Sequence, residues 1–386
     1  MMDFEEFTQQ VAEEIKRFLP SQYEDASVSL QDVTKNNDMQ LTGIMIKTDE
    51  TNITPNIYLE KFYEQYQDGK DFDDILRDIA EVRIKRDVGK DFDVNMITDL
   101  EQVKDHIICK LVNAEMNAEY LANKPHTRIE DLAVMYAVDL GGSKDGHMTA
   151  AVTDNLLEMY GISKEKLHDI ALHNLAESKI EFKTMRDVLI NMMFPDGIPE
   201  NDPRSFMIPP EEEHPSMYVL SNWDTLNGAA ALLDAKTMED ISQKLGGDFI
   251  VLPSSIHEVI VIPADVEMDR RDLEAMVQDV NAGEVLPEER LSDHVYMYDS
   301  REKELVLADR MEERKQQREQ AQKMEKAEER GGRADKADRT ERKPESERVS
   351  MKDMLSEKKV EVAKNEAGRE NPVAKRQGRQ LVNEAA

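Results

Sequence analysis

The sequence contains a single cysteine, Cys109, among its 386 residues. One cysteine cannot form an intramolecular disulfide, and it cannot build a thiolate-rich zinc or iron–sulfur site. Its neighbours in HIICKLV are mostly apolar. We therefore expect Cys109 to be a buried structural thiol and not a nucleophile, because an apolar setting disfavours the reactive thiolate.

Long apolar runs are absent as well. No window approaches the roughly eighteen apolar residues of a membrane-spanning helix. The N-terminus, MMDFEEFTQQ, is acidic and lacks the segments of a secretory signal. The sequence thus predicts a protein that stays in the cytoplasm and has no membrane partner.

Metal and cofactor motifs are also missing. The stretch from Asp91 resembles a calcium loop, but Met96 stands in place of its glycine and Gln102 in place of its bidentate glutamate. The chain has no HExxH motif, and the spacing in the glycine-rich stretch 141–146 is wrong for a phosphate-binding loop. We interpret that stretch as a hairpin loop, and we expect no metal and no cofactor.

Basic residues are scarce in most of the chain. The first 309 residues carry 29 Lys and Arg against 64 Asp and Glu, a net charge of −35, whereas residues 310–386 carry 21 against 17. A domain this acidic repels phosphate backbones at long range. Duplex binding would need a local basic patch that the sequence does not reveal, so we expect no nucleic-acid partner for this domain.

The most informative stretch that is present is GDFIVLPSSIHEVIVIP, residues 247–263. It contains two apolar runs, each followed by a proline, which cannot donate to a strand ladder. The odd and the even positions of each run are both apolar, so both faces of each strand should be covered. We interpret the stretch as a buried hairpin at the centre of an α+β fold, in which mixed sheet hairpins are covered by helices.

Other segments fit the same fold class. Residues 4–18 carry apolar side chains at helical spacing. Residues 36–38 suit the turn of a hairpin, because Asn and Asp tolerate positive φ. Residues 113–123 are helix-prone, and the prolines of residues 195–215 predict a long loop.

The composition changes near residue 308, which suggests a division of the chain. We expect a globular region made of an N-terminal helix plus hairpin at 1–54 and a main α+β domain at 55–308. A solvated charged helix at 309–330 follows, because this segment has too few large apolar residues for a coiled-coil seam. Residues 331–386 have the composition of a disordered charged tail.

One segment of the tail differs from its surroundings. Residues 350–362 begin with a capping serine and carry Met351, Met354 and Leu355 on one side of a possible short helix. This is either a chance cluster in a disordered tail or a segment that folds when it docks in a partner's groove. We expect a protein partner to bind through this tail; the sequence leaves the oligomeric state open.

Three strings carry a resemblance to a known family: YLEKFYEQYQDG, LPSSIHEVIVIP and DHVYMYD, in that order. With them, residues 55–310 resemble an uncharacterised bacterial family, a domain of unknown function often encoded near conjugative mobile elements. The resemblance implies a bacterial, cytoplasmic protein with a mobile-element association. It implies no reaction and no catalytic residue.

The best polar cluster lies in the PSSIHE loop between the two apolar runs. The hydroxyl of Ser255 and the imidazole of His257 are parts of nucleophilic catalysis. In an extended chain, however, His257 and Glu258 point to opposite faces, so this carboxylate could not orient the ring. A structural loop, in which these side chains bond freed backbone groups, is the simpler interpretation.

The sequence therefore favours a non-enzymatic cytoplasmic interaction or accessory protein. A hydrolase acting from Ser255 and His257 is the alternative. The two differ in geometry. The hydrolase needs these side chains at the floor of a cleft with a carboxylate from elsewhere behind the imidazole, whereas the structural interpretation needs them bonded to the backbone.

Overall fold

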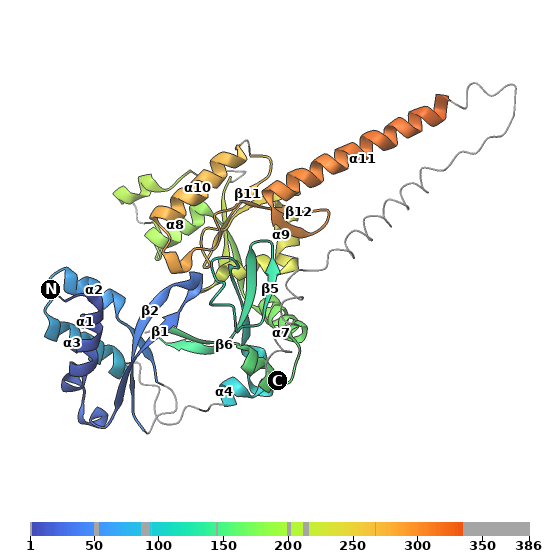
Figure 1. The fold of residues 1–386 in the computed structure, drawn as a ribbon. Coiled ribbons are helices and arrows are strands. Elements are labelled where there is room, and N and C mark those ends of the chain that lie inside the picture. The colour runs from blue at the N-terminus through green and yellow to red at the C-terminus, as the bar shows by residue number, and fades with distance from the viewer. Residues whose placement is uncertain are drawn as a thin grey trace, which may run out of the picture. The chain divides into compact units, whose positions relative to one another are not determined.

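The computed structural model describes residues 2–49, 54–85, 93, 95–143, 146–198, 202–210, 216–266 and 268–334. Residues 1–318 form one compact unit of helices and sheets (Figure 1), which confirms the α+β class. All pairs between the described strands are antiparallel, whereas the mixed sheets expected from the sequence would also contain parallel pairs. In this described part, no helix is both long enough and apolar enough to cross a membrane.

The N-terminal part is a three-stranded sheet covered by helices on one side (Figure 1). Its elements are α1 (Phe4–Glu14), β1 (Ser27–Thr34), β2 (Gln40–Lys47), β3 (Asn56–Tyr58), α2 (Glu60–Gln67) and α3 (Phe72–Lys85). Apolar side chains of the helices pack on Ile44 and Ile46 of β2. The turn between β1 and β2 holds Asn37 and Asp38 at positive φ, as the sequence predicted.

A second sheet is built around a long strand that pairs with all three others. Its strands are β4 (Ile107–Asn113), β5 (His126–Ile129), the central β6 (Leu132–Ser143) and β7 (Gly146–Ala151). Two helices follow it, α6 (Asp154–Tyr160) and α7 (Lys164–Glu177). Helix α7 packs Leu167 and Ala171 against one face of this sheet.

The expected helix at residues 113–123 is wrong, because its residues after Asn113 form turns. The Asn113 side chain accepts the backbone N–H groups two and three residues further on. The Asp38 carboxylate, from the β1–β2 turn, accepts those of Glu119 and Tyr120. Polar side chains thus take the donors that a helix would use within its own backbone.

The third sheet has six strands in the order β13-β12-β10-β11-β9-β8. Their bounds are β8 (Ile180–Thr184), β9 (Tyr218–Asn222), β10 (Phe249–Leu252), β11 (Val259–Pro263), β12 (Tyr296–Asp299) and β13 (Glu304–Leu307). The hairpin expected within residues 247–263 is formed by β10 and β11, the two central strands. That prediction is confirmed.

Both faces of this hairpin are covered. One face belongs to the core that includes α7; its hairpin members are Phe249, Val251, Val259 and Val261. The other face packs Ile250 and Ile262 on helix α10 (Arg270–Gly283). The absence of polar alternation in the two runs follows from this double coverage.

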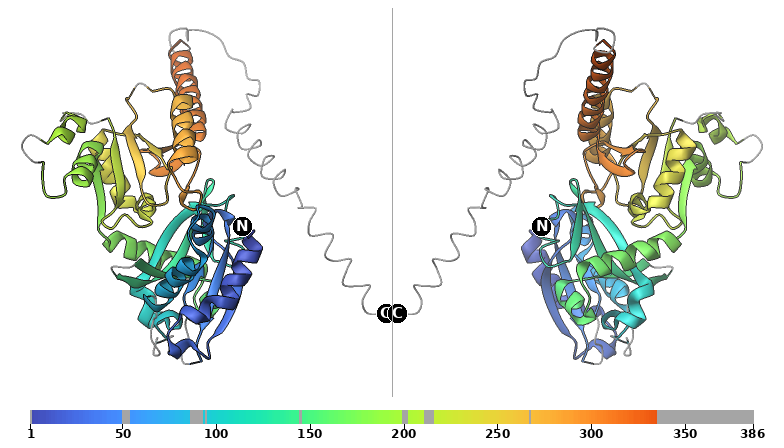
Figure 2. Two further views of the ribbon diagram at one scale, coloured as in Figure 1. Left: turned by 90° about the vertical axis from the view of Figure 1, so that its left-hand side faces the viewer. Right: turned by 90° about the vertical axis from the view of Figure 1, so that its right-hand side faces the viewer.

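The remaining described helices surround the sheets. They include α4 (Asn95–Thr98), α5 (Leu100–Val103), α8 (Met185–Met193), α9 (Ala235–Leu245), α11 (Ala308–Ala334), and the short 3-10 helices η5 (Pro203–Met207) and η6 (Gly228–Leu233). Helix α8 follows the edge strand β8. Figure 2 shows the α8–η5 segment, in green, at the margin of residues 1–318.

Candidate functional site

The Ser255 hydroxyl is occupied by its own loop. Its Oγ accepts the backbone N–H of His257 at 3.0 Å. Backbone bonds then tie the PSSIHE loop to residues 289–292, including an isolated bridge between Ser255 and Arg290. The hydroxyl therefore serves the conformation of the loop.

Both ring nitrogens of His257 face other groups. Nδ1 accepts the backbone N–H of Asn227 at 3.2 Å, and Nε2 lies 3.4 Å from Oε1 of Glu289. Since Nδ1 accepts, the neutral ring carries its proton on Nε2. The ring then has no lone pair left with which to take a proton from Ser255.

The carboxylate that a hydrolase would need is thus present, as Glu289, but the other contacts favour the structural interpretation. Ser255 and His257 both bond to backbone groups. A cavity lies beside the loop, and neither residue lines it. The hydrolase alternative stays a prediction, and these contacts do not support it.

The PSSIHE loop holds one wall of that cavity in place. Its His257 carbonyl accepts the Ser221 hydroxyl at 2.7 Å. A Cβ on Gly228 would lie 2.1 Å from that hydroxyl oxygen and 2.5 Å from the carbonyl oxygen, so only glycine fits there. Together with the bond from Asn227, this close approach fixes residues 222–228.

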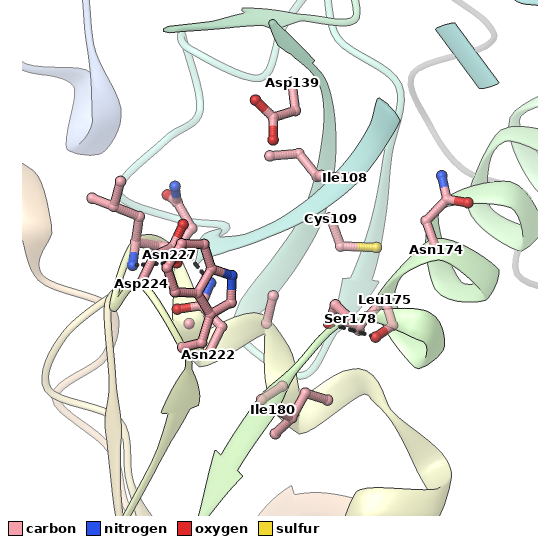
Figure 3. A pocket seen from close by; sticks show the side chains of 15 residues that line it. Ile108, Cys109, Asp139, Asn174, Leu175, Ser178, Ile180, Asn222, Asp224 and Asn227 are labelled. Carbon is pink, nitrogen blue, oxygen red and sulfur yellow. Dashed lines mark hydrogen bonds between the residues drawn. The ribbon is translucent and has the colours of Figure 1, made fainter. Parts of the chain in front are cut away.

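Residues 222–228 form one side of a cavity of about 170 Å³ (Figure 3). The other sides come from β4, β6 and the C-terminal end of α7. Among the described residues, the lining of the cavity has the carboxylates of Asp139 and Asp224 and several amide side chains, and it has no Lys or Arg. The single tryptophan, Trp223, also lines it and is 64% exposed.

The described lining contains no activated nucleophile. Cys109 is buried, as expected, and this burial raises its pKa to about 12, so the thiol stays protonated at neutral pH. Asn174 donates its amide protons to the carbonyls of Lys104 and Ile107. The arrangement can accept hydrogen bonds from a small ligand, but it is not set up to attack one.

Lys110 is a titratable group that belongs to no sequence motif. It lies on β4, where burial and the charge of Lys35 lower its pKa to about 8 against the opposite effect of Asp139. Its Nζ donates to the Thr149 hydroxyl at 2.8 Å. The only sequence signal is one lysine within an apolar strand, and Lys110 does not line the cavity of Figure 3.

A comparison with protein-family models gave a match over most of the chain. Residues 4–300 match the model of a family of unknown function, DUF5688. The chain belongs to this family. The DUF5688 match begins well before residue 55, where the resemblance of the three strings begins, and so includes the N-terminal sheet. No curated protein and no solved structure matches the chain.

The DUF5688 region contains an apolar helix that the sequence patterns did not single out. In α8, MRDVLINMM, six of the nine residues are apolar, yet none is buried. The segment η5 folds back on its end, where the Arg204 guanidinium lies 4.9 Å from the centre of the Phe194 ring. Met192 of α8 is 71% exposed and Phe206 of η5 is 92% exposed. We call these two elements the α8–η5 surface.

Several sequence-based candidates lie outside the described residues. They are the partner-docking residues Met351, Met354 and Leu355 with the possible helix at 350–362, Asp91 of the rejected calcium loop, and residues 144–145 of the glycine-rich stretch. These candidates stay predictions.

We expect His257→Ala to lower the free energy of unfolding by roughly 1–3 kcal/mol, because the Asn227 N–H loses its acceptor. Chemical denaturation would measure the loss. His173→Ala is the matched control, since His173 is exposed on α7 and its removal should change stability by less than about 0.5 kcal/mol. Equal stabilities of the two variants would contradict the structural role of His257.

Proposed function

We propose that this DUF5688 protein is a non-enzymatic interaction protein that binds a partner protein through the α8–η5 surface. The observation that carries the proposal is helix α8, which is mostly apolar but has no buried residue. Apolar surface gains about 25 cal/mol per Å² when it is removed from water. The apolar side chains of α8 are half-buried, except for Met192, which is 71% exposed, so a partner that covers them would gain from their further burial.

The side chains of this surface suit an interface. Met192 and Met207 are both 71% exposed, and Phe206, which precedes Met207, is 92% exposed. Methionine is flexible and polarisable, so it adapts to the shape of a partner. Aromatic and methionine side chains are also enriched at interfaces relative to the rest of the surface.

The charge of the domain indicates what kind of partner fits. Its first 309 residues carry a net charge of −35. Two copies of the chain would repel each other at long range, whereas a basic partner would be attracted and oriented. We therefore propose a heterologous protein with an apolar docking face surrounded by Lys and Arg.

The cellular location and the genetic context of the protein are part of the same proposal. On the resemblance alone, we place the protein in a bacterial cytoplasm, with a gene associated with a mobile element. The tail segment with Met351, Met354 and Leu355 would give a second contact to a protein partner. This second contact rests on the sequence pattern.

The test compares Met192→Asp with Met159→Asp. Both methionines are largely exposed, at 71% and 64%, but Met159 lies on α6, which is not part of the α8–η5 surface. Proteins captured from a host lysate by the wild type would be identified and their binding to purified variants measured. We expect a basic partner whose affinity falls at least tenfold with Met192→Asp and stays unchanged with Met159→Asp.

Two results would overturn the proposal. One is a partner that binds both variants equally. The other is a homodimer, detected by analytical ultracentrifugation, that Met192→Asp dissociates, because the surface would then serve self-association.

A further inference from the structure

A larger cavity, of about 460 Å³, lies elsewhere in residues 1–318. Its walls come from β4, β5, β6, α7, η6, α9, the β12–β13 hairpin and the first turns of α11, several of which are labelled in Figure 1. Small-molecule sites in proteins commonly occupy roughly 300–1,000 Å³. This cavity is thus large enough for a small organic molecule.

Most of the lining is apolar. It includes Leu111, Leu132, Leu172, Leu232, Met238 and Val306. These side chains come from the second sheet, from the helices against it and from β13 of the third sheet, so they surround the space from several directions. Such a lining favours a ligand with an aliphatic or aromatic body.

The cations of the lining differ in how they are paired. Four cations line the cavity, Arg128, Lys303, Arg310 and Arg314, together with two carboxylates, Glu130 and Glu304. Three of these cations have a carboxylate within hydrogen-bonding distance: Lys303 has Glu239, Arg310 has Glu130, and Arg314 has Glu304. Their charges are therefore neutralised within the protein.

One of these cations has donors to spare. Arg128 lies 4.0 Å from the Glu115 carboxylate, beyond hydrogen-bonding distance. Arg310, in contrast, donates to both oxygens of Glu130 at 2.7 Å. Arg310 is therefore held at the edge of the cavity, and Arg128 can offer its planar guanidinium to an incoming anion.

A fixed polar group completes the lining. His168, on α7, contacts the Tyr136 hydroxyl through Nδ1 at 2.9 Å, and that hydroxyl lies 2.9 Å from the Thr127 hydroxyl. Burial raises the pKa of Tyr136 to about 12, so the hydroxyl stays neutral and can hold the ring in place. The chain of contacts orients the imidazole before any ligand arrives.

We infer that this cavity binds an amphiphilic organic anion. The aliphatic or aromatic body occupies the space between the leucines, and the carboxylate, sulfonate or phosphate head lies at Arg128. The inference is independent of the α8–η5 surface, because the two share no residue.

Calorimetric titration of the full chain would test this inference with dodecanoate, below its micelle concentration, as the probe. Dodecyltrimethylammonium is the charge-reversed control ligand. We expect one dodecanoate per chain and no binding of the cation. Arg128→Gln should weaken dodecanoate binding about tenfold, the effect of losing one charge-assisted hydrogen bond.

Two further variants separate the cavity from general charge effects. Arg77→Gln makes the same charge change on α3, at an exposed pair with Asp74, and should leave dodecanoate binding unchanged. Leu233→Trp fills the cavity and should abolish binding, provided that circular dichroism shows a folded protein. Absence of dodecanoate binding, equal binding of the cation, or equal losses in Arg128→Gln and Arg77→Gln would overturn the inference.

Discussion

Replacement of Val261 by Asp should abolish the cooperative unfolding transition of the domain. Val261 is completely buried in β11, where it pairs with Val251 of β10 and Tyr218 of β9. An unpaired buried carboxylate costs several kcal/mol, and a typical domain is stable by only about 5–15 kcal/mol. Loss of the thermal transition in circular dichroism would show the effect.

Two other positions calibrate this result. Ile260, the preceding residue, is half-buried and packs on the opposite face, so Ile260→Asp should destabilise the protein less than Val261→Asp. Val280, on α10, is 37% exposed, and Val280→Asp should leave a cooperative transition. A melting curve of Val261→Asp that matches the wild type would refute the central position of β11.

The central hairpin could be predicted because its information is local. Continuous apolar runs at 249–252 and 259–262 require cover on both faces, and the two cores on either side supply it. The turn at Asn37 and Asp38 was equally local, since their tolerance of positive φ is a property of the residue type. The failure at 113–123 shows the limit, because there the carboxylate of Asp38, about 80 residues away, takes the helix donors.

The candidate sites depend on contacts that sequence reasoning cannot supply. The residue types of the PSSIHE loop were evident from the sequence. The two partners of the His257 ring are Asn227 and Glu289, which lie some 30 residues before and after it in the chain. The cations of the larger cavity are likewise brought together by the fold. Counting charges along the chain therefore gave the net charge of the domain, but it could not show which cation the fold leaves beyond hydrogen-bonding distance of a carboxylate.

Replacement of Asp299 by Asn should lower the free energy of unfolding by roughly 2–4 kcal/mol at pH 7. The Asp299 side chain is completely buried at the end of β12. It accepts Arg318 at 2.7 Å and Arg314 at 3.4 Å, both on α11, and also the backbone N–H groups of Arg301 and Glu302. One carboxylate thus joins two successive turns of α11 to the β12–β13 hairpin.

The control is Glu304→Gln, which removes a carboxylate on β13 that also pairs with helix α11. Glu304 accepts Arg314 at 2.8 Å, but its side chain is 58% exposed. Exposed ion pairs contribute about 0–1 kcal/mol, so this variant should lose far less stability than Asp299→Asn. Equal losses would mean that burial of the Asp299 carboxylate adds nothing to the attachment of α11.

The pH dependence gives an independent check on Asp299. Burial alone would raise its pKa, but the hydrogen bonds from Arg318 and from the backbone of Arg301 and Glu302 outweigh burial and lower it. A carboxyl with a lowered folded-state pKa contributes its full stabilisation above its unfolded pKa of about 3.9 and loses it as the pH falls through the folded value. The stability difference between the wild type and Asp299→Asn should therefore be constant between pH 7 and pH 5 and shrink below about pH 4. A difference that is as large at pH 3 as at pH 7 would mean that the variant acts through packing, and that the charge of Asp299 does not hold α11 to the sheet.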